Sequence, residues 1–180
     1  MKRRIAVLAL AFFFAVSACS FAETVQLSDI VKGGSSEVNV FVKGFTNEAG
    51  DKKIIAEDFK KNFENALLNR KSITFKISDN PASSDIQISG IIKKYQYLEN
   101  DPINSFAGAG GLLLDAATTE NYAELEVEIT VTNSRTNKVI WHDTVVSYIE
   151  RMMTPEESVQ LVYNKVSRNF LWKCFGKPRQ

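Results

Sequence analysis

Apolar and polar residues alternate in five stretches of the chain, which is the period of a β-strand. In the strongest stretch, residues 122–132, apolar residues at odd positions alternate with three glutamates at even positions. This pattern is typical of an antiparallel sheet that has one face on a core and one face in water. The predicted strands are residues 38–43, 73–77, 85–98, 122–132 and 138–149.

Two other stretches have the spacing of helices that bury one side. The first covers residues 53–69. The second begins with Thr154 as N-cap, Pro155 in the first turn and Glu157 completing a capping box, and it ends near Gly176. The predicted buried stripes are Ile55, Phe59, Phe63, Ala66 and Leu67 in the first helix, and Val159, Val162, Tyr163, Val166 and Phe170 in the second.

The order of these elements predicts the fold class. A strand, a helix, two strands, a long segment, two strands and a helix indicate an α+β fold. We expect a two-layer sandwich, mainly an antiparallel sheet, with two helices packed on one face, and a right-handed crossover in the first strand–helix–strand unit. The 180 residues suffice for one core, so we expect a single domain at residues 38–175 and a tail at 176–180.

One strand changes parity along its length. After Lys93 and Lys94 the apolar residues move to Tyr95 and Tyr97, on the other face. A shift of one residue exchanges the two faces of a strand, so we expect a β-bulge near Lys93 and Lys94.

The last strand, residues 138–149, has two competing registers, and a bulge near residues 142–143 would reconcile them. The residues buried in the two registers are Trp141 with Val139 in one, and Ile140 with Val146 and Tyr148 in the other.

The first 18 residues are predicted to be a signal peptide. Lys2, Arg3 and Arg4 precede an apolar run at residues 5–16, and small residues follow. The run is too short to span a bilayer, which needs about 20 apolar residues. An ordinary signal peptide followed by an incidental cysteine remains the alternative.

The residues Val16-Ser17-Ala18-Cys19 closely resemble the bacterial lipobox, an aliphatic residue and two small residues before a cysteine. The resemblance implies that the chain is cut before Cys19, which then carries acyl chains that anchor the protein in a membrane. Ser20, which is not aspartate, implies transfer to the outer membrane, on its periplasmic side.

Residues 19–37 read as a flexible tether, because they include Gly33-Gly34-Ser35-Ser36 and lack a pattern. Leu27, Ile30 and Val31 offer an alternative, in which this segment docks on the domain. A second cysteine, Cys174, is expected to be buried, with pairing to another chain as the alternative.

Composition argues against a nucleic-acid partner. The net charge is +1, and removal of the signal peptide with its three basic residues leaves the mature chain two units negative. A nearly neutral domain has no field that draws it to nucleic acid.

No catalytic constellation is apparent, so we expect a protein that is not an enzyme and has no cofactor. His142 is the single histidine, and no serine or cysteine is placed by sequence to use it. Glu124, Glu126 and Glu128 share one strand face, but calcium needs a shaped loop with six or more oxygens, so no metal site is expected. The glutamates are expected to meet lysines across the strands.

Two sets of residues are candidates for binding. Arg135 and Lys138 lie at the tip of the last hairpin and would contact anionic lipid phosphates, joined by Lys93 and Lys94 if their strand is adjacent. Charged turn residues are more often simply solvated.

Residues 100–119 form a glycine-rich apolar segment that lacks any phosphate-loop spacing. Phe106, Leu112, Leu113 and Leu114 would either contact a partner or lipid, or fold back over the sheet.

Three features together resemble the lipopolysaccharide-assembly lipoprotein family, LptE. They are the lipobox at residues 16–19, the hairpin at 121–149, which opens on Asn121-Tyr122-Ala123, and the capped helix at 154–172. The resemblance implies a partner of an outer-membrane β-barrel that inserts lipopolysaccharide. YajG-like envelope lipoproteins share the order of elements. The alternative is a tethered binding or regulatory module of another envelope complex.

Overall fold

The structure, a computed structural model, describes residues 24–26, 30, 37–99 and 120–177. Five strands, two helices and one 3-10 turn follow one another along the described chain. They are β1 (Glu37–Asn47), α2 (Ala56–Leu68), β2 (Thr74–Ile77), η1 (Pro81–Ser83), β3 (Ile86–Leu98), β4 (Asn121–Asn133), β5 (Lys138–Arg151) and α4 (Pro155–Phe175).

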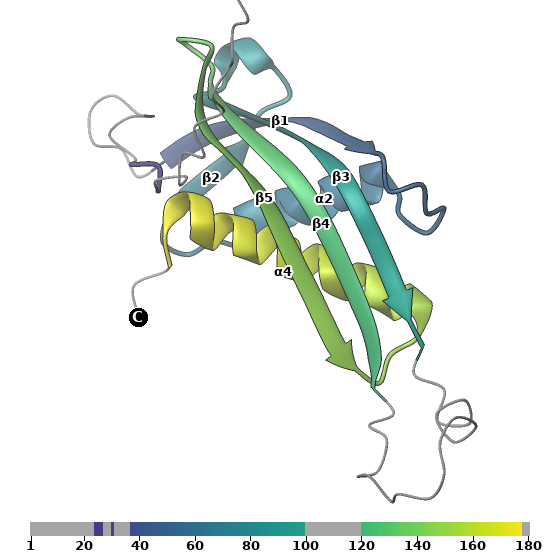
Figure 1. The fold of residues 1–180 in the computed structure, drawn as a ribbon. Helices are drawn as coiled ribbons and strands as arrows, with labels where there is room; N and C mark the ends of the chain where they lie inside the picture. The colour runs from purple at the N-terminus through teal and green to yellow at the C-terminus, as the bar shows by residue number, and fades with distance from the viewer. Residues whose placement is uncertain (1–23, 27–29, 31–36, 100–119, 178–180) are drawn as a thin grey trace, which may run out of the picture.

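The strands form one mixed sheet in the order β2-β1-β3-β4-β5. β1 pairs in parallel with β2 and β3, whereas β3, β4 and β5 pair antiparallel. Both helices cover the same face of the sheet, and no helix of the described residues lies on the other face (Figure 1). The α+β class and the two-layer arrangement are therefore confirmed.

The inner face of the sheet and the two helix stripes form the core. Phe59, Phe63 and Leu67 of α2 are fully buried, as predicted. Ile55 was predicted to join them, but that prediction is wrong, because its side chain is 52% exposed. The helix begins at Ala56, three residues later than predicted, with Ile55 as its extended N-cap, and Ile54 enters the core in place of Ile55.

Aromatic rings join the sheet to both helices. The ring of Phe45 on β1 contacts Phe59 at a centroid distance of 4.6 Å and Phe63 at 5.2 Å. Phe63 contacts Phe170 of α4 at 4.9 Å, and Phe170 contacts Trp141 of β5 at 5.3 Å. This chain of edge and tilted ring contacts crosses the molecule from one helix to the other.

Both expected irregularities of the sheet occur, one of them at a different place. The β3–β4 register shifts between Ile92 and Lys94, as predicted. In the hairpin, Trp141 pairs with Val131 and Val139 with Thr132, so the extra residue is Ile140, and the expected bulge near residues 142–143 is wrong.

The bulge at Ile140 resolves the competing registers of β5. Trp141, Val145 and Ser147 point into the core, so neither expected set is buried as a whole. The side chains on the outer face are Val139, Val146 and Tyr148, which are 59%, 48% and 55% exposed.

Both ends of α4 are capped. Thr154 and Glu157 form the predicted capping box, and Gly176 with a φ of 77° ends the helix. At that end, the backbone carbonyl of Cys174 accepts a hydrogen bond from the N–H of Val25 at 2.8 Å. Arg70 donates to the carbonyls of Leu171, Phe175 and Gly176 at 2.6, 3.1 and 2.7 Å. The carbonyls of Cys174, Phe175 and Gly176, which lie at the end of the helix and have no partner within it, thus gain donors from elsewhere in the chain.

The described part of the expected tether lies against the domain. Ile30 is 1% exposed in the core, and Val25 forms the backbone hydrogen bond to Cys174. Cys174 itself is fully buried and unpaired, and burial raises the pKa of its thiol. None of the described helices is long and apolar enough to cross a membrane.

Gly90 of β3 leaves room for the ring of Phe45. A Cβ at this position would lie 2.5 Å from the carbonyl oxygen of Glu128 and 2.9 Å from the Phe45 ring. We predict that Gly90→Ala lowers the free energy of unfolding by about 1–3 kcal/mol in urea denaturation, because backbone and ring must move apart. Ser89→Ala on the outer face is the control; equal stability of both variants would contradict this packing.

Candidate functional site

None of the described helices covers the outer face of the sheet, so the side chains of this face are open to contacts (Figure 1). At the end where β3 stops and β4 starts, it carries four large apolar side chains. Register places Leu98 of β3 opposite Tyr122 of β4. On β5, Tyr148 lies opposite Glu124 and Val146 lies opposite Glu126. We call these four residues the outer apolar patch.

The two tyrosines of the outer apolar patch hold each other in place. Their rings stack with centroids 6.0 Å apart and planes at 20°. The Nζ of Lys165 lies 5.0 Å from the ring centroid of Tyr148 and donates to the Tyr148 carbonyl at 2.5 Å. The Tyr122 hydroxyl donates to the Glu124 carboxylate, and this bond, with some burial, raises the pKa of Tyr122 to about 12.

Lysines and glutamates pair across the strands beside the patch, as predicted. The Nζ of Lys94 lies 2.7 Å from Glu124, and the hydrogen bonds from Lys94 and Tyr122 lower the pKa of that carboxyl. Lys93 lies 2.9 Å from Glu48 and 3.6 Å from Glu128, and its hydrogen bond to Glu48 raises the pKa of its ammonium.

The expected basic site is divided between two places. Ile86 pairs with Asn133 beside the hairpin tip, whereas Lys94 pairs with Glu126, eight residues further along β3. At a rise of about 3.3 Å per residue, this separates Lys93 and Lys94 from the tip by about 26 Å. They therefore add nothing to a patch at the tip, although β3 does neighbour the hairpin.

At the tip itself, Arg135 forms contacts within the domain, whereas Lys138 is exposed. Arg135 lies 3.5 Å from Asp85 and donates to the backbone carbonyl of Ile30. Its guanidinium thus fastens the N-terminal segment and the start of β3 to the turn. Lys138 forms no ion pair with any residue that the structure describes.

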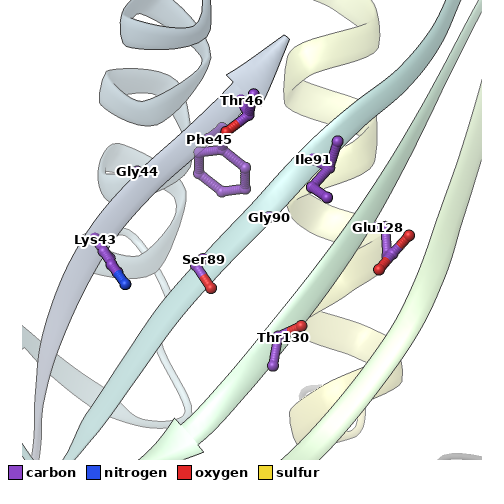
Figure 2. A pocket seen from close by; sticks show the side chains of 9 residues that line it. All are labelled: Lys43, Gly44, Phe45, Thr46, Ser89, Gly90, Ile91, Glu128 and Thr130. Atoms are coloured by element: carbon purple, nitrogen blue, oxygen red, sulfur yellow. The ribbon is translucent and has the colours of Figure 1, made fainter. Parts of the chain in front are cut away.

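A shallow hollow of about 400 Å³ opens on the outer face between β1 and β3 (Figure 2). It lies where Gly44 and Gly90 carry no side chain, and the ring of Phe45 forms its floor. The remaining lining residues are Lys43, Thr46, Ser89, Ile91, Glu128 and Thr130.

Three polar side chains next to the hollow lie in a row that sequence spacing did not reveal. The hydroxyl of Thr130 lies 2.9 Å from Nδ1 of His142, whose Nε2 lies 3.7 Å from Glu128. The distance to Glu128 is too long for the orienting hydrogen bond of a catalytic triad, and His142 is half exposed. No group of three metal-ligating residues occurs in the described parts of the chain.

The remaining sequence candidates lie outside the described residues. These are the lipidation residue Cys19 and the apolar residues Phe106, Leu112, Leu113 and Leu114.

The sequence did not show the two β5 residues of the outer apolar patch, because it allowed two registers for that strand. Val146 and Tyr148 were placed in the core in one of them, and the position of the bulge decides their face.

Comparison with known proteins identifies the fold. No family model and no curated protein matches the chain. A point variant of the PelC dodecamer from Paraburkholderia phytofirmans is similar with a TM-score of 0.50 and 12% identity, over 77% of this chain and 90% of that chain. Lipoprotein GNA1162 from Neisseria meningitidis is similar with a TM-score of 0.40 and 9% identity, over 74% of this chain and 97% of that chain. At such identity, the likeness to PelC shows a common fold.

The Lys94–Glu124 pair predicts a pH-dependent stability. Because the folded-state pKa of Glu124 lies below its ordinary value of 4.5, its contribution is present above that pH and is lost as the pH falls through the folded-state pKa. Glu124→Gln should therefore be less stable than the parent at pH 7, by about 1 kcal/mol or less. The two proteins should converge in urea denaturation at acidic pH. Glu126→Gln is the control, and a difference that persists in acid would contradict the assignment.

Proposed function

We propose that this protein is a lipid-anchored, non-catalytic module of the bacterial envelope that binds another protein through the outer face of its sheet. The outer apolar patch carries this proposal. Scattered exposed apolar residues are ordinary, but here four lie together on neighbouring strands.

The composition of the outer face suits a protein interface. Leu98, Val146 and Tyr148 are about half exposed, and complete burial of a large apolar side chain is worth about 1.5–3 kcal/mol. The stacked tyrosines are already ordered, so a partner gains their area with little loss of rotamer freedom. Lys94 and Glu124 provide a polar rim beside them.

The lipid anchor is supported by the sequence alone. The lipobox at residues 16–19 implies acylation of Cys19, and Ser20 implies the periplasmic side of the outer membrane. Two acyl chains already suffice for stable membrane binding.

The absence of an enzymatic role is part of the proposal. The row Thr130, His142 and Glu128 lies on an open strand face and lacks the orienting bond of a triad. Backbone N–H groups of inner strands bond to their neighbours, so they offer no donor for a developing oxyanion beside Thr130.

A second copy of the chain is the first partner to test. The similar PelC structure is described as a dodecamer, so this fold supports self-assembly in at least one protein. The same face would then be shared between subunits.

Lipopolysaccharide assembly with an outer-membrane β-barrel is the second candidate. The exposed Lys138 at the hairpin tip favours it, because an ammonium there is free to meet a lipid phosphate. It ranks second because Arg135, Lys93 and Lys94, the other basic residues of that interpretation, are engaged within the domain.

Photo-cross-linking in living cells tests the proposed interface. A photoreactive phenylalanine analogue at Tyr148 should form one defined adduct with a protein, and Val146→Lys in the same chain should weaken it at least about tenfold by placing a charge in an apolar contact. An adduct at twice the chain mass would identify a second copy.

The control is the same analogue at Gln160, an exposed residue of α4 on the helical layer. Equal adducts from both positions, or none from Tyr148, would contradict binding through the outer face. An adduct with lipopolysaccharide would instead favour the second candidate.

A further inference from the structure

The N-terminal segment contacts the domain only a few residues after residue 19, although the expected tether extends to residue 37. Val25 donates its backbone N–H to Cys174 at 2.8 Å, and Ile30 is buried. The Cγ2 of Thr24 lies 3.7 Å from the position that a Cβ on Gly176 would occupy. The chain therefore reaches the domain at Thr24, beside the C-terminal end of α4.

This contact limits how far the domain can stand from a lipid anchor. An extended chain spans at most about 3.5 Å per residue, so the five steps from Cys19 to Thr24 cover at most about 18 Å. A free tether over residues 19–37 would let any face turn toward the membrane. With the segment docked, the C-terminal end of α4 is the end that the anchor holds near the bilayer.

The surface around that end of α4 carries exposed basic side chains and a tryptophan. Arg168 lies over the ring of Trp172 at 5.1 Å, and Trp172 is 37% exposed. We call this surface the basic end. Its residues are Lys71, Arg168, Trp172, Lys173 and Lys177.

Hydrogen bonds of Arg70 bring the two helices together at the basic end. Arg70 donates to the carbonyl of Gly176 at 2.7 Å, so Lys71 and Lys177, the residues that follow each of them, lie at the same end of the molecule. Lys173 pairs with Asp143 at 2.8 Å. Lys71 and Lys177 form no ion pair with any residue of the described ranges, which leaves their charges available.

The other end of the molecule is acidic. Carboxylates gather where β3 and β5 stop and β4 and α4 begin, with Arg151 and Lys53 as basic residues among them. They are Glu99, Glu120, Glu150, Glu156 and Glu157. Charge is thus separated along the molecule, with the basic end on the side where the chain leaves toward residue 19.

From the short connection and the charge separation we infer that the basic end rests on the anionic lipid headgroups of the bilayer that holds Cys19. The inference depends on the lipid anchor of the proposed function. A lysine near an anionic membrane surface strengthens binding roughly fivefold, and tryptophan prefers the headgroup region. The outer apolar patch, next to the acidic end, then faces away from the membrane and stays open to a protein partner.

Energy transfer from Trp172 to a headgroup-dansylated lipid measures this contact in the mature lipidated protein. In vesicles of phosphatidylethanolamine and phosphatidylglycerol, transfer should be efficient, and in phosphatidylcholine vesicles or at high salt it should fall. The Trp172→Phe variant measures the energy transfer that comes from the buried Trp141, and this value is subtracted from the total transfer.

Charge reversal tests the named lysines. The Lys71→Glu, Lys177→Glu double variant should lower the ratio of membrane-apposed to lifted domain by roughly 25-fold or more, since each lost lysine removes roughly fivefold. Energy transfer in the double variant should fall to the level that the parent protein shows in phosphatidylcholine vesicles. Lys52→Glu is the matched control, an exposed lysine before the other end of α2, and it should keep the parent transfer.

Vesicle flotation distinguishes a failure of the inferred headgroup contact from a failure of the lipid anchor. A protein that floats but shows the same transfer in both lipids, or in the double variant, overturns the inference and leaves the anchor standing. A protein that does not float overturns the lipid anchor, and the inference with it.

Discussion

The capping of the C-terminal end of α4 is the interaction on which the arrangement of this molecule depends. The last carbonyls of any helix lack partners within the helix, and a buried one is costly if it stays unpaired. Here the guanidinium of Arg70, from the segment after α2, and the N–H of Val25, from the N-terminal segment, supply the donors. One helix end therefore ties together parts of the chain that are about 45 to 150 residues apart in sequence, and burial accordingly lowers the pKa of Arg70.

The second constraint is that two helices cover only one face of a five-stranded sheet. The covered face accounts for the strict alternation of β4, where every second side chain is fully buried. The uncovered face must stay soluble without a helix layer, and pairs such as Lys94 with Glu124 serve that purpose. Val139 and the four residues of the outer apolar patch depart from this polar pattern, and the patch is the part of this face on which the proposed function rests.

Local patterns in the sequence predicted the elements well. The capping box at Thr154 and Glu157 and the alternation of β4 are set by neighbouring residues, and the parity change after Lys93 reports its bulge directly. The position of the bulge in β5 is different. Ile140, Trp141 and Val146 are all apolar, so the apolar pattern does not select the register, and it is the observed register that packs Trp141 against Phe170.

Features that depend on distant parts of the chain escaped the sequence. Nothing near Arg70 in sequence shows that its donors will meet the end of a helix that lies about 100 residues later. The separation of Lys94 from the hairpin tip follows from the pairing of whole strands, which spacing within one strand cannot give. The segment at residues 19–37 has a flexible composition, yet Ile30 finds a place in the core.

Amide hydrogen exchange at Val25, followed by NMR in the mature protein, tests the central claim most directly, because the docking of this segment sets the distance between anchor and domain. The bond from Val25 to Cys174 predicts strong protection, comparable to that of the last turn of α4. Exchange at the rate of an unstructured chain would contradict the docking and return residues 19–37 to a free tether.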